Sequence, residues 1–132
     1  SKLASLDSAL KQASTDDKEV RPEDVHHLDL AENELADDLP ELMQYTSLLS
    51  LDLAHNNIEA MPTGMSTTLR HLNLSYNRLE VVPRQLSAMR SLIELNLGYN
   101  VLSSIGVLEG LVSVQVLLLA GNRLEDLQGL AA

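Results

Sequence analysis

One eleven-residue pattern occurs five times in this chain of 132 residues and limits what the chain can fold into. Its clearest copy is LRHLNLSYNRL at residues 69–79, which reads Leu-x-x-Leu-x-Leu-x-x-Asn-x-Leu. The other copies are VHHLDLAENEL from residue 25, LLSLDLAHNNI from 48, LIELNLGYNVL from 92 and VQVLLLAGNRL from 114. Alternating leucines predict a short strand with one buried face. Regular copies of such a strand predict stacked repeats that bury one another's apolar faces.

Each copy carries an asparagine two positions before the apolar residue that ends it. These asparagines are separated by 23, 21, 23 and 22 residues, and they are Asn33, Asn56, Asn77, Asn100 and Asn122. A buried amide at the end of a strand can satisfy backbone groups that the turn would leave unpaired. Because every copy carries one, we interpret the five asparagines as structural and not catalytic.

The pattern and its period resemble the intracellular leucine-rich repeat family over residues 25–132. The resemblance implies an α/β fold, a right-handed horseshoe solenoid with a parallel concave sheet of about five strands. We expect the strands near residues 26–30, 49–53, 70–74, 93–97 and 115–119. The return segments resemble different subclasses: residues 80–91 are similar to the Ras-suppressor-like repeats. Residues 103–114 are similar to the class typified by the protein phosphatase-1 regulatory subunit, which returns through 3₁₀ turns.

The N-terminal segment is predicted to be an amphipathic helix. Its apolar residues stand at helical spacing over residues 1–13, as Leu3, Leu6, Leu10 and Ala13. We assign residues 1–24 to a capping helix and linker that cover the open end of the first repeat, with contact to a partner as the alternative role. Residues 25–132 form the five repeats.

A second short helix is expected in residues 36–47, after the first strand. Asp38 is placed to cap it, and Pro40 fits its first turn. Its predicted core-facing residues are Leu39, Leu42 and Met43.

No polar capping segment follows the fifth repeat within the sequence. Terminal repeats need a covered outer face, so we expect that the chain is truncated at its C-terminus. Self-association through the uncapped edge is the alternative.

The net charge of -10 lies entirely in the first half of the chain. Residues 1–60 hold 14 Asp or Glu against 4 Lys or Arg, whereas residues 61–132 hold 5 of each. An acidic surface disfavours nucleic acid and favours a protein partner with a basic segment. A solvated acidic cap without a dedicated partner is the alternative.

The chain has no cysteine and no apolar run of the 18 or more residues that a membrane span needs. Small secreted domains often depend on disulfides, so we expect a cytoplasmic protein without membrane contact, with a nuclear or cytoskeleton-associated location also open.

Candidate binding residues follow from the strand alternation, which points every second residue out onto the concave sheet face. The central outward column is Asp29, Asp52, Asn73, Asn96 and Leu118, and a flanking column includes His27 and His71. Tyr76 and Tyr99 stand directly before the asparagines of their repeats, and we group Ile93 and Leu118 with them as one patch of aromatic and aliphatic residues. The predicted partner-binding residues are Asp29, Asp52, His71, Asn73, Tyr76, Ile93, Asn96, Tyr99 and Leu118.

The sequence shows no nucleophile–base pair, phosphate-binding glycine loop or zinc spacing, so we expect no enzyme, cofactor or metal site. We therefore predict a protein-interaction scaffold or adaptor that binds on the concave face, in a signalling or a cytoskeletal or flagellar assembly. The alternative is an acidic nuclear leucine-rich repeat protein that binds histones or other basic proteins. The absence of excess acid beyond Glu59 argues against that alternative.

Overall fold

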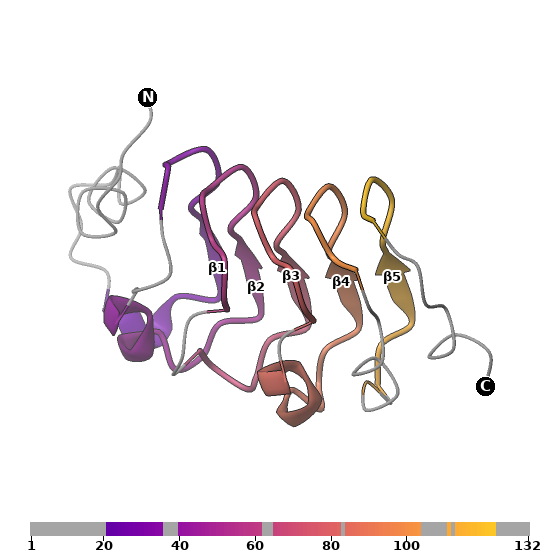
Figure 1. The fold of residues 1–132 in the computed structure, drawn as a ribbon. Coiled ribbons are helices and arrows are strands. Elements are labelled where there is room, and N and C mark those ends of the chain that lie inside the picture. The colour runs from indigo at the N-terminus through magenta and orange to yellow at the C-terminus, as the bar shows by residue number, and fades with distance from the viewer. Residues whose placement is uncertain are drawn as a thin grey trace.

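The structure, a computed structural model, describes residues 21–35, 40–61, 65–82, 84–103, 111 and 113–123. Its strands are β1 His27–Asp29, β2 Ser50–Asp52, β3 His71–Asn73, β4 Glu94–Asn96 and β5 Val116–Leu118. They form one parallel sheet in chain order, and Figure 1 shows them side by side. The five predicted strands are confirmed, each one residue shorter at either end than expected.

Hydrogen bonding between repeats continues past the ends of these short strands. The Leu30 amide donates to the Asp52 carbonyl at 2.8 Å, and the Glu32 amide donates to the Ala54 carbonyl at 2.9 Å. Equivalent bonds join the later repeats. The loops that follow the strands, which form the upper edge in Figure 1, are therefore held in the same register as the sheet.

Leucine ladders run through the core beneath the sheet. The central strand residues pair in register as Leu28, Leu51, Leu72, Leu95 and Leu117. The first four are buried, and Leu117 is partly buried against them. A second ladder two residues later, Leu30, Leu53, Leu74 and Leu97, is 0% exposed. The sequence alternation is thus confirmed as the source of the core.

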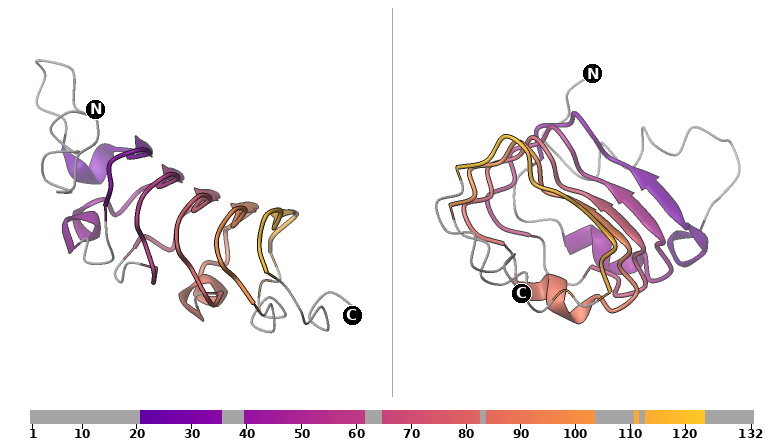
Figure 2. Two further views of the ribbon diagram at one scale, coloured as in Figure 1. Left: turned by 45° about the horizontal axis from the view of Figure 1, so that its top comes forward. Right: turned by 90° about the vertical axis from the view of Figure 1, so that its right-hand side faces the viewer.

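The described residues contain three 3₁₀ helices: η1 Pro22–Asp24 precedes β1, and η2 Pro40–Gln44 and η3 Arg84–Ala88 lie in the return segments. The view along the stack in Figure 2 places the sheet on one side and the return segments on the other. In η3, Leu86 is buried, and Met89 directly after the helix is buried as well. Side chains three apart share one face of a 3₁₀ helix, so both point into the core.

A short helix follows the first strand, but it is the 3₁₀ helix η2 of residues 40–44, and one of the predicted core residues is wrong. The predicted cap at Asp38 lies outside the described residues. Leu42 is 1% exposed, whereas Met43 is 59% exposed, and Tyr45 takes the inward position instead. The cause is the helix type: with three residues per turn, Leu42 and Tyr45 are eclipsed and Met43 is turned outward.

Several expectations fall on residues that the structure does not describe. The capping helix of residues 1–13, the inward placement of Leu39, the 3₁₀ return predicted within residues 103–114 and the end of the fifth repeat all lie wholly or mainly outside the described ranges. Those expectations stay predictions.

Candidate interaction surface

The five repeat asparagines form a hydrogen-bonded column along one edge of the core. The Asn77 side-chain amide donates to the carbonyls of Leu53 (2.9 Å), Leu74 (3.1 Å) and Ser75 (3.1 Å), and its oxygen accepts from the Ile58 amide at 3.0 Å. Asn56, Asn100 and Asn122 repeat this arrangement.

Neighbouring asparagines also share acceptors. The Leu53 carbonyl accepts from both Asn56 and Asn77, and the Leu74 carbonyl accepts from both Asn77 and Asn100. These amides therefore join each repeat to the one before it, and their hydrogen-bonding groups are engaged inside the fold.

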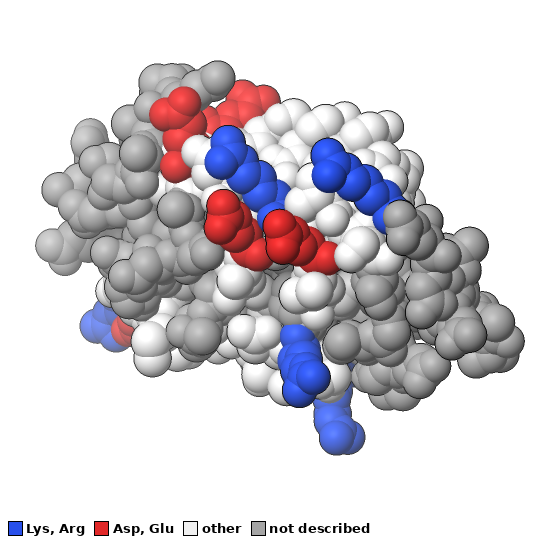
Figure 3. All heavy atoms as spheres, in the orientation of Figure 1, with Lys and Arg blue, Asp and Glu red and all other residues white. Residues whose placement is uncertain are grey.

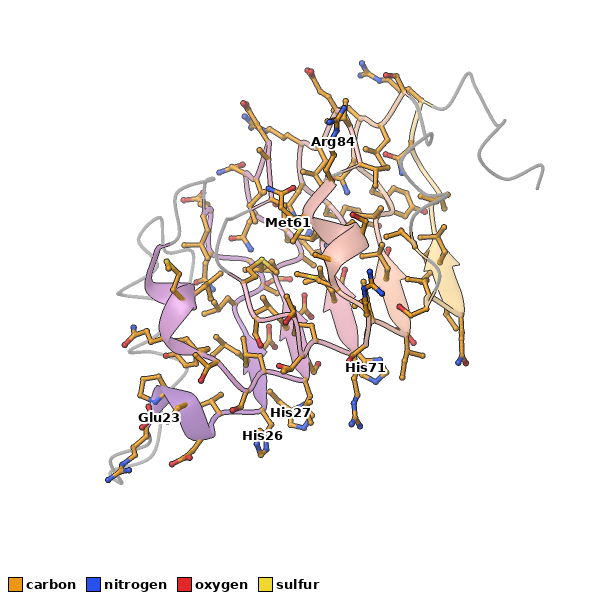
Figure 4. All side chains as sticks on the ribbon, turned by 90° about the horizontal axis from the view of Figure 1, so that it is seen from below. Glu23, His26, His27, Met61, His71 and Arg84 are labelled. Atoms are coloured by element: carbon orange, nitrogen blue, oxygen red, sulfur yellow. The ribbon has the colours of Figure 1, made fainter. Side chains whose placement is uncertain are left out.

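The outward face of the sheet, which is the concave face of the predicted horseshoe, carries two columns. One is His27, Ser50, His71, Glu94 and Val116, and the other is Asp29, Asp52, Asn73, Asn96 and Leu118. All ten side chains are exposed or half-buried. Figure 4 shows His27 and His71 on the side of the molecule opposite Arg84.

The Asp/Asn column has a structural role that the sequence did not indicate. Asp29, Asp52, Asn73 and Asn96 each accept, through Oδ1, the backbone amide two residues later, at 3.0, 2.9, 3.0 and 2.9 Å. Side chains of this type stabilise turns. These side chains therefore start the turn out of each of the first four strands, with Asp in the first two repeats and Asn in the next two.

The first two members of this column are carboxylates on paired positions of β1 and β2. Burial raises the pKa of Asp52 above its usual value, the Ala54 amide lowers it, and the charge of Asp29 raises it further, while His55 lowers it. The Asp29 and Asp52 carboxylates thus repel each other, and among the described residues only His55 lowers the pKa of Asp52 by its charge. This end of the face is therefore suited to a cation.

The outward face offers little enclosure for chemistry. A shallow hollow of about 150 Å³ lies among β2, β3 and β4, next to Asp52, His71 and Glu94. Within the described ranges, no three His, Cys, Asp or Glu side chains are grouped closely enough to hold a metal ion.

At β5 the outward face changes from polar to apolar. Val116 is 43% exposed and Leu118 is 46% exposed, at the positions that hold Glu94 and Asn96 in β4. The face therefore runs from carboxylates on β1 and β2 to aliphatic groups on β5.

Tyr76 and Tyr99 lie at the edge of this face, in the loops that follow β3 and β4. Their rings are stacked, with centroids 4.5 Å apart, and His55 stacks on Tyr76 at 4.1 Å. All three residues have positive φ, between 53° and 56°. Their backbone amides also continue the ladder between repeats. Equal backbone conformations in fixed register place the rings flat on one another, and we call this set the ring ladder.

The ring ladder ends at Gly121 on its C-terminal side. Gly121 has φ of 73°, and a Cβ built there would clash with the ring of Tyr99. The absence of a side chain at this position leaves room for the Tyr99 ring against the backbone of the fifth repeat.

Gly121→Ala is expected to lower the free energy of unfolding by about 1–2 kcal/mol, because an L side chain is strained at positive φ, and to displace the Tyr99 ring. Urea denaturation measures the first effect, and the NMR shifts of the Tyr99 ring protons measure the second. Gly98→Ala is the control, because its Cβ would lie 3.1 Å from Asn96 Oδ1 and 3.3 Å from the Ala120 carbonyl oxygen without meeting the Tyr99 ring. Equal destabilisation by both changes, with unmoved Tyr99 shifts, would contradict this assignment.

The ring ladder borders an open groove of about 610 Å³. Its lining includes Glu32 and Glu34 as well as His55, Tyr76 and Tyr99. The sequence pattern indicates both tyrosines as binding residues but not His55 or the two glutamates, although His55 and Glu32 occupy the same repeat position as the tyrosines. The structure brings these residues together, because the rings of His55, Tyr76 and Tyr99 stack and the two glutamates line the same groove.

Ile93 does not join the tyrosines in one patch. It is half-buried and lies directly before β4, whereas Tyr99 follows that strand. The two residues therefore lie at opposite ends of the same strand, and the grouping of Ile93 with Tyr76, Tyr99 and Leu118 is corrected.

The opposite side of the molecule carries mixed charge. Figure 3 shows acidic and basic side chains next to one another there, and one hollow is lined by Glu59, Arg78 and Glu80. A second hollow, of about 580 Å³, contains Met61, Val81 and Arg84 near η3. Since Val81 is 64% exposed, this hollow is the principal rival to the outward face.

In the part of the chain that the structure describes, no helix is long and apolar enough to cross a membrane.

Comparison with known families finds two matching family models. One, described as Leucine rich repeat, matches residues 67–124, and another, described as Leucine Rich repeat, matches residues 45–60. No protein with a curated description matches the chain by sequence.

Solved structures show the same fold in proteins of other kinds. A chain of the octameric complex of latrophilin 3, Unc5D and FLRT2 aligns with a TM-score of 0.69 and 25% identity, over 86% of this chain and 37% of that one. Internalin C2 of Listeria monocytogenes aligns with a TM-score of 0.70 and 25% identity, over 81% and 47%. The plant peptide hormone receptor RGFR1, solved with RGF2, shares the fold at 22% identity and a TM-score of 0.52, over 78% and 22%. The present chain thus spans less than half the length of each neighbour.

Proposed function

Because the chain is a leucine-rich repeat protein, we propose that it is an interaction scaffold that binds a protein partner on the outward face of its sheet. The observation that carries this proposal is the change of that face along the stack, from Asp29 and Asp52 at one end to Val116 and Leu118 at the other. The asparagine column and the leucine ladders are inside the fold, whereas Val116 and Leu118 are exposed. Asp29 and Asp52 use Oδ1 for the turn and are exposed and half-buried, respectively.

The character of the face indicates a partner with a basic segment followed by an apolar one. Carboxylates speed the encounter with a basic segment and set its direction. Val116 and Leu118, once covered, contribute apolar burial. His71, Asn73 and Asn96 lie between the two ends, with Tyr76 and Tyr99 at the rim. A standard interface buries about 800 Å² on each partner, and the five strands with their adjoining loops are the platform that we propose for it.

The structural neighbours support the same class of function. One of them belongs to the octameric complex of latrophilin 3, Unc5D and FLRT2. Their partners are not carried over to this chain. A cytoplasmic location, in a signalling or cytoskeletal assembly, stays part of the proposal, and the proposal includes no catalytic step.

The proposal is tested with charge-only variants of the face. Asp29→Asn and Asp52→Asn keep the Oδ1 acceptor, because Asn73 and Asn96 make the same backbone hydrogen bond in later repeats. A partner captured from cell extract is purified, and its association is measured with each variant. We expect each change to slow association about threefold to tenfold at low salt and to reduce the salt dependence of the rate.

Two further variants complete this experiment. Leu118→Ala is expected to weaken binding by about 1 kcal/mol, mainly through faster dissociation. Arg84→Ala, on the opposite side, is the control and should leave both rates unchanged. If Arg84→Ala weakens binding more than the outward-face changes do, the partner binds the side that carries η3.

A further inference from the structure

The ring ladder stops at His55, one repeat before the end of the described solenoid. His55, Tyr76 and Tyr99 stack with nearly parallel planes, 10° and 8° apart. The equivalent position in the first repeat holds Glu32, which has the same left-handed backbone, with φ of 61°, but no ring. The first repeat therefore adds no ring to the stack, and its residue at this position is a glutamate.

Two carboxylates stand where the ladder stops. Glu32 and Glu34 are exposed and line the same groove as the three rings. In the described part of the chain, no Lys or Arg lines that groove. Among the described residues, neither carboxylate forms an ion pair. The Asn57 side chain donates to the backbone carbonyl of Glu34 at 3.4 Å, which does not involve the Glu34 carboxylate.

We propose that this groove binds an arginine side chain of a protein partner, with its guanidinium stacked on His55 as the next layer of the ladder. Glu32 and Glu34 accept the hydrogen bonds of the guanidinium. A guanidinium is planar and weakly hydrated, it stacks on aromatic faces, and it presents a fork of donors to carboxylates. A lysine ammonium has the charge but neither the plane nor the fork.

This site lies in the loops after the strands and not on the outward face. It therefore does not depend on the proposed function, and its test uses neither Asp29, Asp52 nor Leu118. An arginine probe can bind here whether or not a partner covers the sheet.

The test is an NMR titration of the full chain with the amide of N-acetyl-arginine, beside the matching citrulline and lysine compounds. We expect saturable shifts for the arginine probe at the amides of Glu32, His55 and Tyr76, and an upfield ring-current shift of its δ-methylene protons. The citrulline and lysine compounds should bind at least about tenfold more weakly, since each lacks the charge or the planar fork.

Variants separate stacking from charge. The double change Glu32→Gln and Glu34→Gln should weaken the arginine probe about tenfold, because it removes both charged acceptors. His55→Asn is chosen because asparagine tolerates the left-handed backbone, and it should abolish the ring-current shift. Glu94→Gln, which changes a carboxylate on β4, is the matched control and should have no effect.

Three results would overturn the proposal. They are equal binding of the lysine and arginine compounds, shifts centred on β1 and β2 in place of the groove, and unchanged affinity in the double glutamine variant. Loss of partner binding in the outward-face variants with an intact arginine titration would leave this site in place, and the reverse pattern would leave the proposed function in place.

Discussion

Asn77→Ala is expected to lower the free energy of unfolding by about 3 kcal/mol, because buried groups left without a partner each cost about 1–3 kcal/mol. Asn77 is 8% exposed and bonds three carbonyls and the Ile58 amide. In its absence the Ile58 amide loses its acceptor inside the core. Urea denaturation monitored by circular dichroism measures the effect.

Asn57→Ala is the matched control. Asn57 is a half-buried asparagine one residue after Asn56, the equivalent of Asn77 in the preceding repeat. Within the described residues, its side chain makes one 3.4 Å bond, to the backbone carbonyl of Glu34. Surface changes of this kind usually alter stability by less than about 0.5 kcal/mol. If both alanine variants unfold at the same urea concentration, the asparagine column does not hold the repeats together.

Leu72→Ala is expected to cost a similar amount, about 3 kcal/mol, within the range of large-to-small changes in packed cores. Leu72 is 2% exposed at the centre of the middle strand and is paired in register with Leu51 and Leu95. A cavity there removes contacts with the repeats on both sides. Because each repeat is stabilised by its neighbours, the loss should be felt across the stack.

The comparison that tests this reasoning is Leu117→Ala, at the same position of the fifth repeat. Leu117 is only partly buried, so its truncation should cost about 1 kcal/mol, near the value for one or two buried methylene groups. The difference between the two variants is read from chemical denaturation at fixed temperature. A larger loss for Leu117→Ala would mean that the ladder is not the continuous core described above.

The backbone of the fold was predictable because its signals are local and repeated. Leucines at alternate positions defined all five strands to within one residue at each end, and the repeat period defined the parallel stack. Met43 was placed wrongly because its segment was judged with helical spacing, whereas the 3₁₀ helix η2 turns Met43 outward and Tyr45 inward. That choice between helix types depends on packing against the neighbouring repeat.

The surface was less predictable, since it depends on backbone conformations that no sequence pattern states. The outward columns followed from strand alternation. The hydrogen bonds by which Asp29 and Asp52 start the turn did not follow from it. They form only where the backbone leaves the strand, and the alternation does not say where that is. Likewise, the stacking of His55 on Tyr76 requires left-handed backbone at both residues, and neither side chain type indicates it.

The most direct measurement of the central claim is the methyl NMR spectrum of the chain during titration with its purified partner. Val116 and Leu118 report on the outward face, and Val81 and Met43 report on the side of the return segments, all with exposed side chains. We predict that the methyl signals of Val116 and Leu118 shift and saturate with the partner, while those of Val81 and Met43 stay in place. Saturable shifts of Val81 and Met43, with Val116 and Leu118 unchanged, would contradict binding on the outward face of the sheet.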